Sequence, residues 1–168
     1  KDGYMDYVIK NGTKIEGLSG ASDSDVTVTG MVGEYIITVV AVNGNDKMAT
    51  ETTFTGLKWE SIGIGMLSSS FFGGEGECEF YKASPVLKYK AIGPFEEGYD
   101  IVFDVADNNS VTVAQQAVYS SYGSYGTLYV SGNGALQSNK ITVNLTFRVS
   151  AGVFGAFTET FILPVTEP

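Results

Sequence analysis

The 168-residue chain contains no histidine and a single cysteine, Cys78. Without histidine it cannot build a Ser-His-Asp or Cys-His nucleophile, a His-ligated zinc or copper site, or an imidazole proton shuttle. One cysteine can form neither an internal disulfide nor a thiolate cage for a metal. Catalysis would have to rely on carboxylates, tyrosine, lysine or an oxygen-ligated metal, and we expect the protein not to be an enzyme.

Positive charge and long apolar segments are also scarce. Ten Lys and Arg stand against 19 Asp and Glu, giving a net charge of -9, so the chain lacks the basic stripe that a nucleic-acid-binding protein uses to displace counterions. No stretch approaches the ~20 apolar residues of a membrane-spanning helix. The hydrophobic content of 43% still supplies enough apolar side chains for a packed core. We therefore expect a folded protein with no nucleic-acid partner and no transmembrane segment.

Strand-like patterns run along nearly the whole chain. β-Branched and aromatic residues alternate with polar ones, turn residues such as Asn-Gly and Asp-Asn separate the runs, and no ten-residue run has a helical apolar period. The pattern predicts an all-β protein of two antiparallel β-sandwich modules, at 1–55 and 57–168. The expected strands are 4–10, 25–29, 35–42, 49–54, 78–82, 86–91, 100–105, 110–113, 126–130, 140–149 and 158–164.

The first module carries a family pattern. After a strand at 4–10 and a Thr-x-Thr strand at 25–29, residues 33–44 read Gly-x-Tyr-x-Ile-x-Val-x-Ala-Val-x-Gly. This order resembles the C-terminal part of a fibronectin type III or immunoglobulin-like module. The resemblance implies that the first two strands are missing. It also implies that Tyr35 occupies the tyrosine-corner position, with its hydroxyl bonded back to the backbone.

The second module also carries a family pattern. Its motifs are Trp-Glu-Ser-Ile-Gly at 59–63, Gly-Pro-Phe at 93–95, Asp107 to Val113, Gly-Asn-Gly at 132–134 and Phe-Ile-Leu-Pro at 161–164. They resemble the C-terminal domains of Bacteroides-type surface lipoproteins of unknown function. The resemblance implies a jelly-roll-like sandwich on the extracellular side of an outer membrane. Because the chain opens on Lys-Asp-Gly and Cys78 lies far from that start, we expect the signal and the lipid anchor to lie outside this fragment.

Three tyrosines form the most informative local cluster. Tyr119, Tyr122 and Tyr125 are separated only by serine and glycine, a composition typical of adaptable binding loops. Their flat rings can stack on the apolar faces of sugars while neighbouring hydroxyl and amide groups orient the ligand. The alternative is that the rings pack beneath the loop as part of the core.

Three further aromatic residues are candidates for ligand binding. Phe71 and Phe72 lie between a serine run and a pair of glycines, so at least one ring is expected to protrude. Trp59 follows the junction between the modules. The competing explanation for all three is burial in the core or at the junction, because large aromatic side chains dominate burial wherever they occur.

Oxygen-rich turns provide a candidate calcium site. Asp104, Asp107 and Asn109, together with Asn108, fall around one predicted turn, and calcium is bound by six to eight oxygen ligands. The spacing does not match an EF-hand, and Asx residues also form ordinary turns. The acids Glu75, Glu77 and Glu79 are expected to form a solvated strand face rather than a hydrolytic pair.

Together these features favour a non-catalytic cell-surface module for binding or adhesion, with carbohydrate as the preferred ligand. No cofactor is expected beyond a structural calcium ion. The alternative function is that of a structural spacer or assembly subunit of a bacterial envelope complex, with an envelope protein as partner through sheet edges or the aromatic surface.

Overall fold

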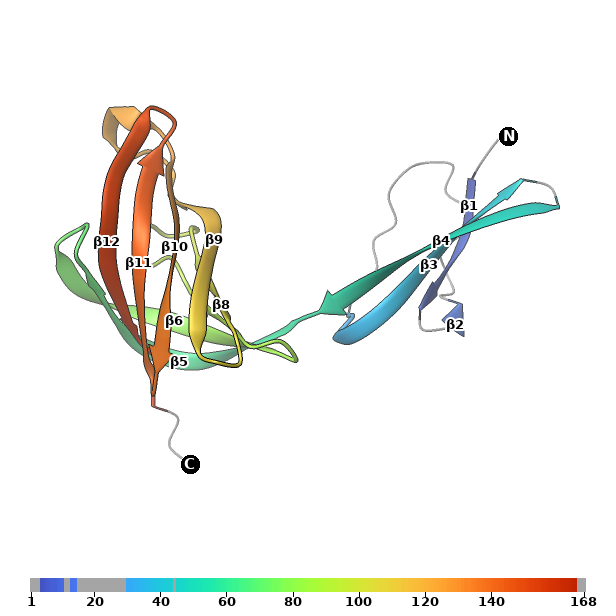
Figure 1. Cartoon of the computed structure of the whole chain (residues 1–168), viewed down its shortest axis with the longest axis horizontal. Coiled ribbons are helices and arrows are strands. Elements are labelled where there is room, and N and C mark those ends of the chain that lie inside the picture. The colour runs from blue at the N-terminus through green and yellow to red at the C-terminus, as the bar shows by residue number, and fades with distance from the viewer. Residues whose placement is uncertain (1–3, 11–12, 15–29, 44, 166–168) are drawn as a thin grey trace. The chain divides into compact units, whose positions relative to one another are not determined.

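In a computed structural model of the chain, residues 4–10, 13–14, 30–43 and 45–165 are described. They form β-strands and one 3-10 turn, η1 (Gly123–Tyr125), with no α-helix among them. The chain divides into two compact units, Lys1–Lys58 and Trp59–Pro168, each with its own sheet (Figure 1). The prediction of an all-β chain is confirmed for this part of the protein.

The first unit contains a four-stranded sheet with the order β2-β1-β3-β4. Strands β3 and β4 pair along their whole length, from Gly33 opposite Gly56 to Asn43 opposite Asp46. The Tyr35 hydroxyl donates a hydrogen bond to the Val32 carbonyl at 2.7 Å, as expected. The strands are β1 (Tyr4–Lys10), β2 (Thr13–Lys14), β3 (Gly33–Asn43) and β4 (Asp46–Gly56).

The second unit is a closed eight-stranded barrel in which consecutive strands are neighbours and the last strand, β12, pairs with the first, β5. Four residue pairs join these two strands, from Glu159 opposite Ser69 to Ile162 opposite Met66. The strands are β5 (Lys58–Ser69), β6 (Gly74–Ser84), β7 (Lys88–Ala91), β8 (Ile101–Val105), β9 (Ser110–Tyr119), β10 (Leu128–Gln137), β11 (Lys140–Val149) and β12 (Gly152–Ile162).

The interior of the barrel is filled by side chains. Along β11, every second residue is buried while the intervening residues face outward, as the two-residue period of a strand requires. The other strands contribute in the same way, so an eight-stranded barrel encloses a packed core rather than a channel. The largest completely buried side chains include Phe80, Phe103, Phe147 and Phe161.

The prediction of two sandwich modules is wrong. The larger sheet closes on itself, and the described residues of the first unit form one sheet rather than two facing ones. A sandwich and a barrel produce the same alternation of buried and exposed residues, so the pattern could not distinguish them. Closure depends on pairing between β5 and β12. These strands are far apart in the sequence, and no local sequence pattern indicates that they pair. The expected strand at 25–29 lies outside the described residues.

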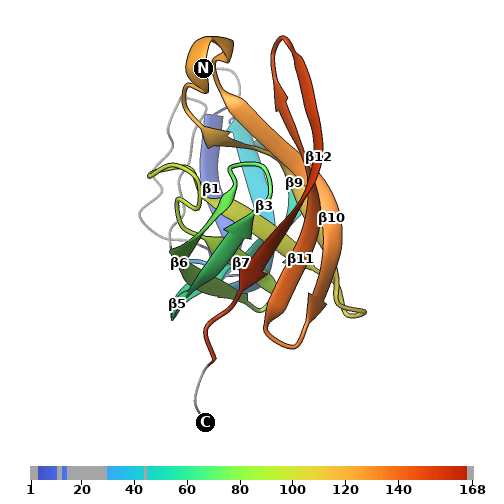
Figure 2. The same ribbon diagram turned by 90° about the vertical axis from the view of Figure 1, so that its left-hand side faces the viewer.

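The connections of the barrel fall into two groups. Because successive strands run in opposite directions, the β5–β6, β7–β8, β9–β10 and β11–β12 connections lie at one end of the barrel, and the other connections lie at the opposite end. Figure 2 shows η1 and the β11–β12 turn at the same end. No helix within the described residues is long and apolar enough to cross a membrane.

Candidate functional site

Aromatic side chains gather at the end of the barrel that carries the first group of connections. Three of its four connections contribute at least one ring, Tyr119 adds another from the end of β9, and Phe154 adds one from the start of β12. We call this set the aromatic end. Its members are Phe71, Phe72, Phe95, Tyr119, Tyr122, Tyr125 and Phe154.

Phe71 forms the base of the aromatic end. Its ring stacks on the buried ring of Phe147, with centroids 4.0 Å apart and planes 5° apart. It also contacts Phe157 at 5.0 Å and Tyr122 at 5.7 Å. Phe71 is half-buried and packs against the core, so its primary role is to cover the end of the barrel.

Three rings of the aromatic end are substantially exposed. Phe72 is 39% exposed, Phe154 39% and Tyr125 52%. Phe72 lies 6.1 Å from Tyr122, Tyr122 lies 5.5 Å from Phe154, and Phe154 lies 5.6 Å from Tyr125, measured between ring centroids. The exposed rings are thus linked through half-buried Tyr122 into one continuous aromatic surface.

A β-bulge sets the position of Phe154. In the pairing of β11 with β12, Phe147 is opposite Gly155 while Arg148 is opposite Val153, which leaves Phe154 as the extra residue. Bulges of this kind bend the strand and redirect a side chain, and Gly155 adopts a φ of 128° that other residues rarely tolerate. The bulge therefore explains why an exposed phenylalanine contacts the tyrosine loop.

The tyrosine loop between β9 and β10 is held by hydrogen bonds of its own backbone. The Tyr122 N–H donates to the Gly126 carbonyl at 2.8 Å, and the Tyr125 N–H donates to the Tyr122 carbonyl at 3.1 Å. The carboxylate of Glu96, from the β7–β8 connection, accepts hydrogen bonds from both the N–H and the hydroxyl of Ser120. These contacts give the tyrosines a defined arrangement before any ligand binds.

Glu159 is a buried residue of this region that sequence reasoning missed. It is 0% exposed, and its Oε1 accepts a hydrogen bond from the Phe71 N–H at 3.0 Å. The Ser69 hydroxyl and the Ser70 N–H also bond to the carboxylate, while burial raises its pKa. Glu159 therefore holds the turn that carries Phe71 and Phe72. The alternation of Phe157, Glu159 and Phe161 could have indicated its inward position.

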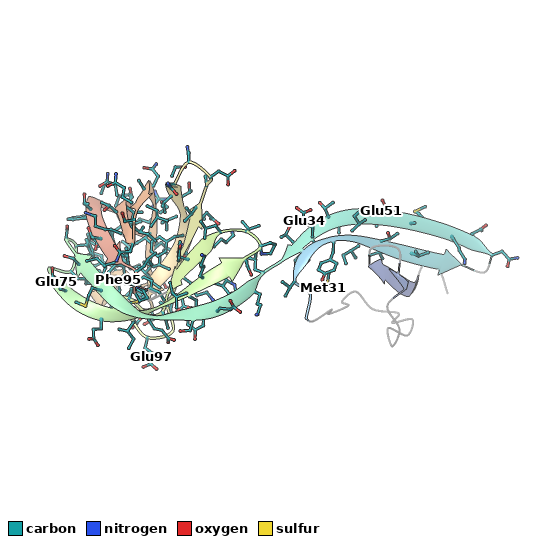
Figure 3. The ribbon with its side chains drawn as sticks, turned by 90° about the horizontal axis from the view of Figure 1, so that it is seen from below. Met31, Glu34, Glu51, Glu75, Phe95 and Glu97 are labelled. Carbon is teal, nitrogen blue, oxygen red and sulfur yellow. The ribbon has the colours of Figure 1, made fainter. Side chains whose placement is uncertain are left out.

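A shallow groove of about 240 Å³ adjoins the exposed ring of Phe72. The β5–β6 hairpin forms one side, and the β7–β8 connection forms the other with Pro94 and Phe95. Figure 3 shows Glu75 and Phe95 at this end of the barrel. Apolar rings with a nearby carboxylate suit a ligand that has both apolar faces and hydroxyl groups. The full lining is Leu67, Ser69, Phe72, Gly74, Glu75, Gly76, Pro94 and Phe95.

The remaining predicted site residues do not join the aromatic end. Trp59 lies at the start of β5, half-buried, with the Lys90 ammonium 4.4 Å from its ring. Asp107 and Asn109 lie in the β8–β9 turn at the opposite end of the barrel, where the Asn109 N–H donates to the Ala106 carbonyl. Asp104 forms an ion pair with Lys88 at 2.5 Å.

The calcium site stays a prediction. Asn108 Oδ1 accepts a hydrogen bond from the Ser110 N–H at 3.0 Å, which is the ordinary turn-forming role of an Asx residue. Within the described ranges, no group of three or more Cys, Asp or Glu side chains is placed to hold a metal ion. The oxygen atoms around this turn are therefore engaged with the protein itself at Asp104 and Asn108.

The acids and the cysteine of β6 lie on opposite faces of that strand. Glu75, Glu77 and Glu79 are exposed, while Cys78 is 5% exposed. Burial raises the pKa of the Cys78 thiol to about 11, with smaller contributions from Asp100 and Glu79. A thiol with this pKa is a poor nucleophile at neutral pH, which agrees with its expected structural role.

The chain was also compared with known proteins. No protein-family model matches it, and no curated protein or solved structure is significantly similar. Functional inference therefore depends on the geometry of the site itself.

Proposed function

We propose that the chain is a non-catalytic module that binds carbohydrate through the aromatic end, in the cell-surface setting implied by the family resemblance. The observation that carries the proposal is the exposure of Phe72, Tyr125 and Phe154 on one continuous surface beside a groove. Large exposed aromatic patches are rare on proteins that have no binding partner.

The physical basis is the match between these rings and a sugar. Pyranose rings present apolar C–H faces that pack on aromatic rings, and their hydroxyl groups need hydrogen-bond partners at the edge of the contact. Glu75 and the serines of the tyrosine loop provide such partners beside the rings. Because hydrogen bonds already order the tyrosine loop, little conformational entropy is lost on binding.

A glycan-array screen of the full chain tests the proposal. Tyr125→Ala and Phe72→Ala each remove an exposed ring, and each is expected to weaken binding of the selected glycan by about fivefold or more. Tyr122→Ala is less informative, because Tyr122 is half-buried and supports its neighbours. The screen is run in calcium and again in EDTA, so that a requirement for the ion is detected separately.

Ile64→Ala is the matched control. Ile64 is 64% exposed on β5 and is absent from the aromatic contacts and the groove lining. Its replacement is expected to leave binding unchanged. Absence of any glycan bound by the unmodified chain, or an equal loss in the Ile64 variant, would contradict the proposal.

A second candidate function, that of an assembly subunit, is favoured by strand β4. Among the described residues β4 has one neighbouring strand, β3, and every residue of β4 except its last is exposed. Edge strands of this kind can accept another strand from a partner protein. The N–H of Thr53, which is opposite Ile36 in a pair that does not hydrogen-bond to β3, points to the free edge of β4. Thr53→Pro would therefore block such pairing, and sedimentation of the wild type and this variant over a concentration series would detect it if the partner is a second copy.

A further inference from the structure

Arg148 is the only arginine of a chain whose net charge is -9. It lies on the outward face of β11, beside its cross-strand neighbour Tyr129 on β10. Its guanidinium donates a hydrogen bond to Gln115 Oε1 on β9 at 3.1 Å. Three adjacent strands thus bring an arginine, an amide and an aromatic ring together on the outside of the barrel.

These side chains line a shallow depression of about 390 Å³. The β11–β12 turn and the start of β12 complete it, and Val153 on β12 directly precedes Phe154 of the aromatic end. The depression and the aromatic end therefore share the β11–β12 hairpin. The full lining is Gln115, Tyr129, Arg148, Val149, Ser150, Ala151, Gly152 and Val153.

The charge of Arg148 has no carboxylate partner within the described residues. Acidic residues outnumber basic ones in the chain, yet the ion pair seen in the described part joins Asp104 to Lys88 and not to Arg148. One of the five guanidinium donors is used by Gln115. A half-buried guanidinium with open donors is suited to bind a planar carboxylate through two parallel hydrogen bonds.

We infer that this depression binds the carboxylate of an acidic sugar, such as a uronic acid, and that the glycan recognised by the aromatic end is acidic. The carboxylate lies against the Arg148 fork, and the sugar ring lies beside the face of Tyr129. This inference rests on the proposed carbohydrate function for the glycan, but the contact with a single acidic sugar can be tested separately.

The first experiment follows Arg148 directly by NMR. Because the chain has one arginine, the side-chain Nε–Hε resonance can be assigned without ambiguity. Free glucuronate is expected to shift this resonance in a saturable manner, while glucose at the same concentrations is not. Glucose 6-sulfate distinguishes a carboxylate site from a general anion site. The inference would be overturned if neither glucuronate nor glucose 6-sulfate shifted the resonance, or if glucose shifted it as much as glucuronate does.

The second experiment measures the affinity of the full chain for oligogalacturonate and for its carboxyl-reduced, neutral counterpart. We expect the acidic form to bind about 10-fold more tightly or better, and Arg148→Gln to remove the difference. Arg148→Lys, which keeps the charge but loses the fork, is expected to restore only part of it. Lys140→Gln removes one positive charge from an exposed position on the same strand and is expected to change nothing.

The outcomes separate this inference from the broader proposal. Equal binding of acidic and neutral oligosaccharides, both sensitive to Tyr125→Ala, would overturn the acidic-sugar inference and leave the carbohydrate function standing. A glucuronate-dependent shift at Arg148 without binding of any oligosaccharide would support the acidic-sugar contact and contradict the carbohydrate function of the aromatic end. If Lys140→Gln reduced the preference for the acidic oligosaccharide as much as Arg148→Gln does, the preference would come from the overall charge of the protein and not from a site at Arg148.

Discussion

Strand β3 of the first unit and strand β11 of the second differ in a way that their sequences do not suggest. β3 is the more apolar strand, with Ile, Val and Tyr at most positions, whereas β11 contains Lys, Asn, Arg and two Thr among its ten residues. Yet β11 buries every second side chain completely or nearly so, and the described part of β3 contains one buried apolar residue, Val40. Closure of a sheet, rather than the apolar content of a strand, decides which side chains leave water.

This contrast predicts a large difference in the cost of removing an aromatic ring from the two units. Phe161 is 0% exposed in the barrel, with Phe103 4.8 Å from it between ring centroids. Phe161→Ala is expected to lower the free energy of unfolding of the barrel by about 3–5 kcal/mol, through lost burial and the cavity left behind. Urea unfolding followed by the fluorescence of Trp59, the single tryptophan, measures this loss.

Phe54→Ala provides the comparison in the open sheet. Phe54 is 48% exposed, so its removal is expected to cost about 1 kcal/mol or less, because much of the ring is already in water. Hydrogen exchange of the β3 amides measures the stability of the first unit. A loss of equal size in both variants would show that the first unit has a core comparable to that of the barrel.

The second prediction compares two carboxylates that each bond to a neighbouring hydroxyl. Glu159 is buried in the barrel and bonds to Ser69, with its Oε2 lacking a hydrogen-bond partner among the described residues. Glu51 is exposed on β4 and accepts a hydrogen bond from Thr38 at 3.2 Å. Burial should make ionisation costly at Glu159, whereas Glu51 is exposed to solvent.

Glu159→Gln is therefore expected to stabilise the barrel at pH 7 by about 1 kcal/mol. Because the folded-state pKa of Glu159 is raised from its ordinary value, its favourable contribution is complete below the ordinary pKa and is lost as the pH rises through the raised one. The gain in the variant should accordingly shrink at pH 4. Urea unfolding at both pH values measures it.

Glu51→Gln is the control and should change stability by less than about 0.5 kcal/mol at either pH. A loss of stability in Glu159→Gln that is larger at pH 7 than at pH 4 would reverse the argument. It would show that the N–H groups of the Phe71 turn stabilise the charged carboxylate by more than its burial costs.

The all-β class and most of the aromatic residues of the candidate site could be predicted from the sequence, whereas the closure of the barrel and the meeting of these residues at one end could not. The tyrosines at 119, 122 and 125 and the phenylalanines at 71 and 72 are brought together, because their loops belong to connections at the same end of the barrel. Phe154 was missed because its position depends on a bulge, and a bulge of this kind leaves no clear signal in a single sequence. Glu159 was missed because a glutamate is ordinarily exposed, so its place in the inward alternation with Phe157 and Phe161 was not given weight.

The smallest change in the free energy of unfolding is expected for substitutions at solvent-exposed positions, where the two units should behave alike. Met48 on β4 is 77% exposed and Ile64 on β5 is 64% exposed, so Met48→Lys and Ile64→Lys should each change the free energy of unfolding by less than about 0.5 kcal/mol. Hydrogen exchange reports the first unit, and Trp59 fluorescence reports the barrel. A loss above about 1 kcal/mol confined to Met48→Lys would show that β4 is covered in solution, because a lysine at an uncovered position has no desolvation cost. If that loss depended on protein concentration, the cover over β4 would be a second copy of the chain. The contrast between the closed barrel and the open sheet would then hold only for the monomer.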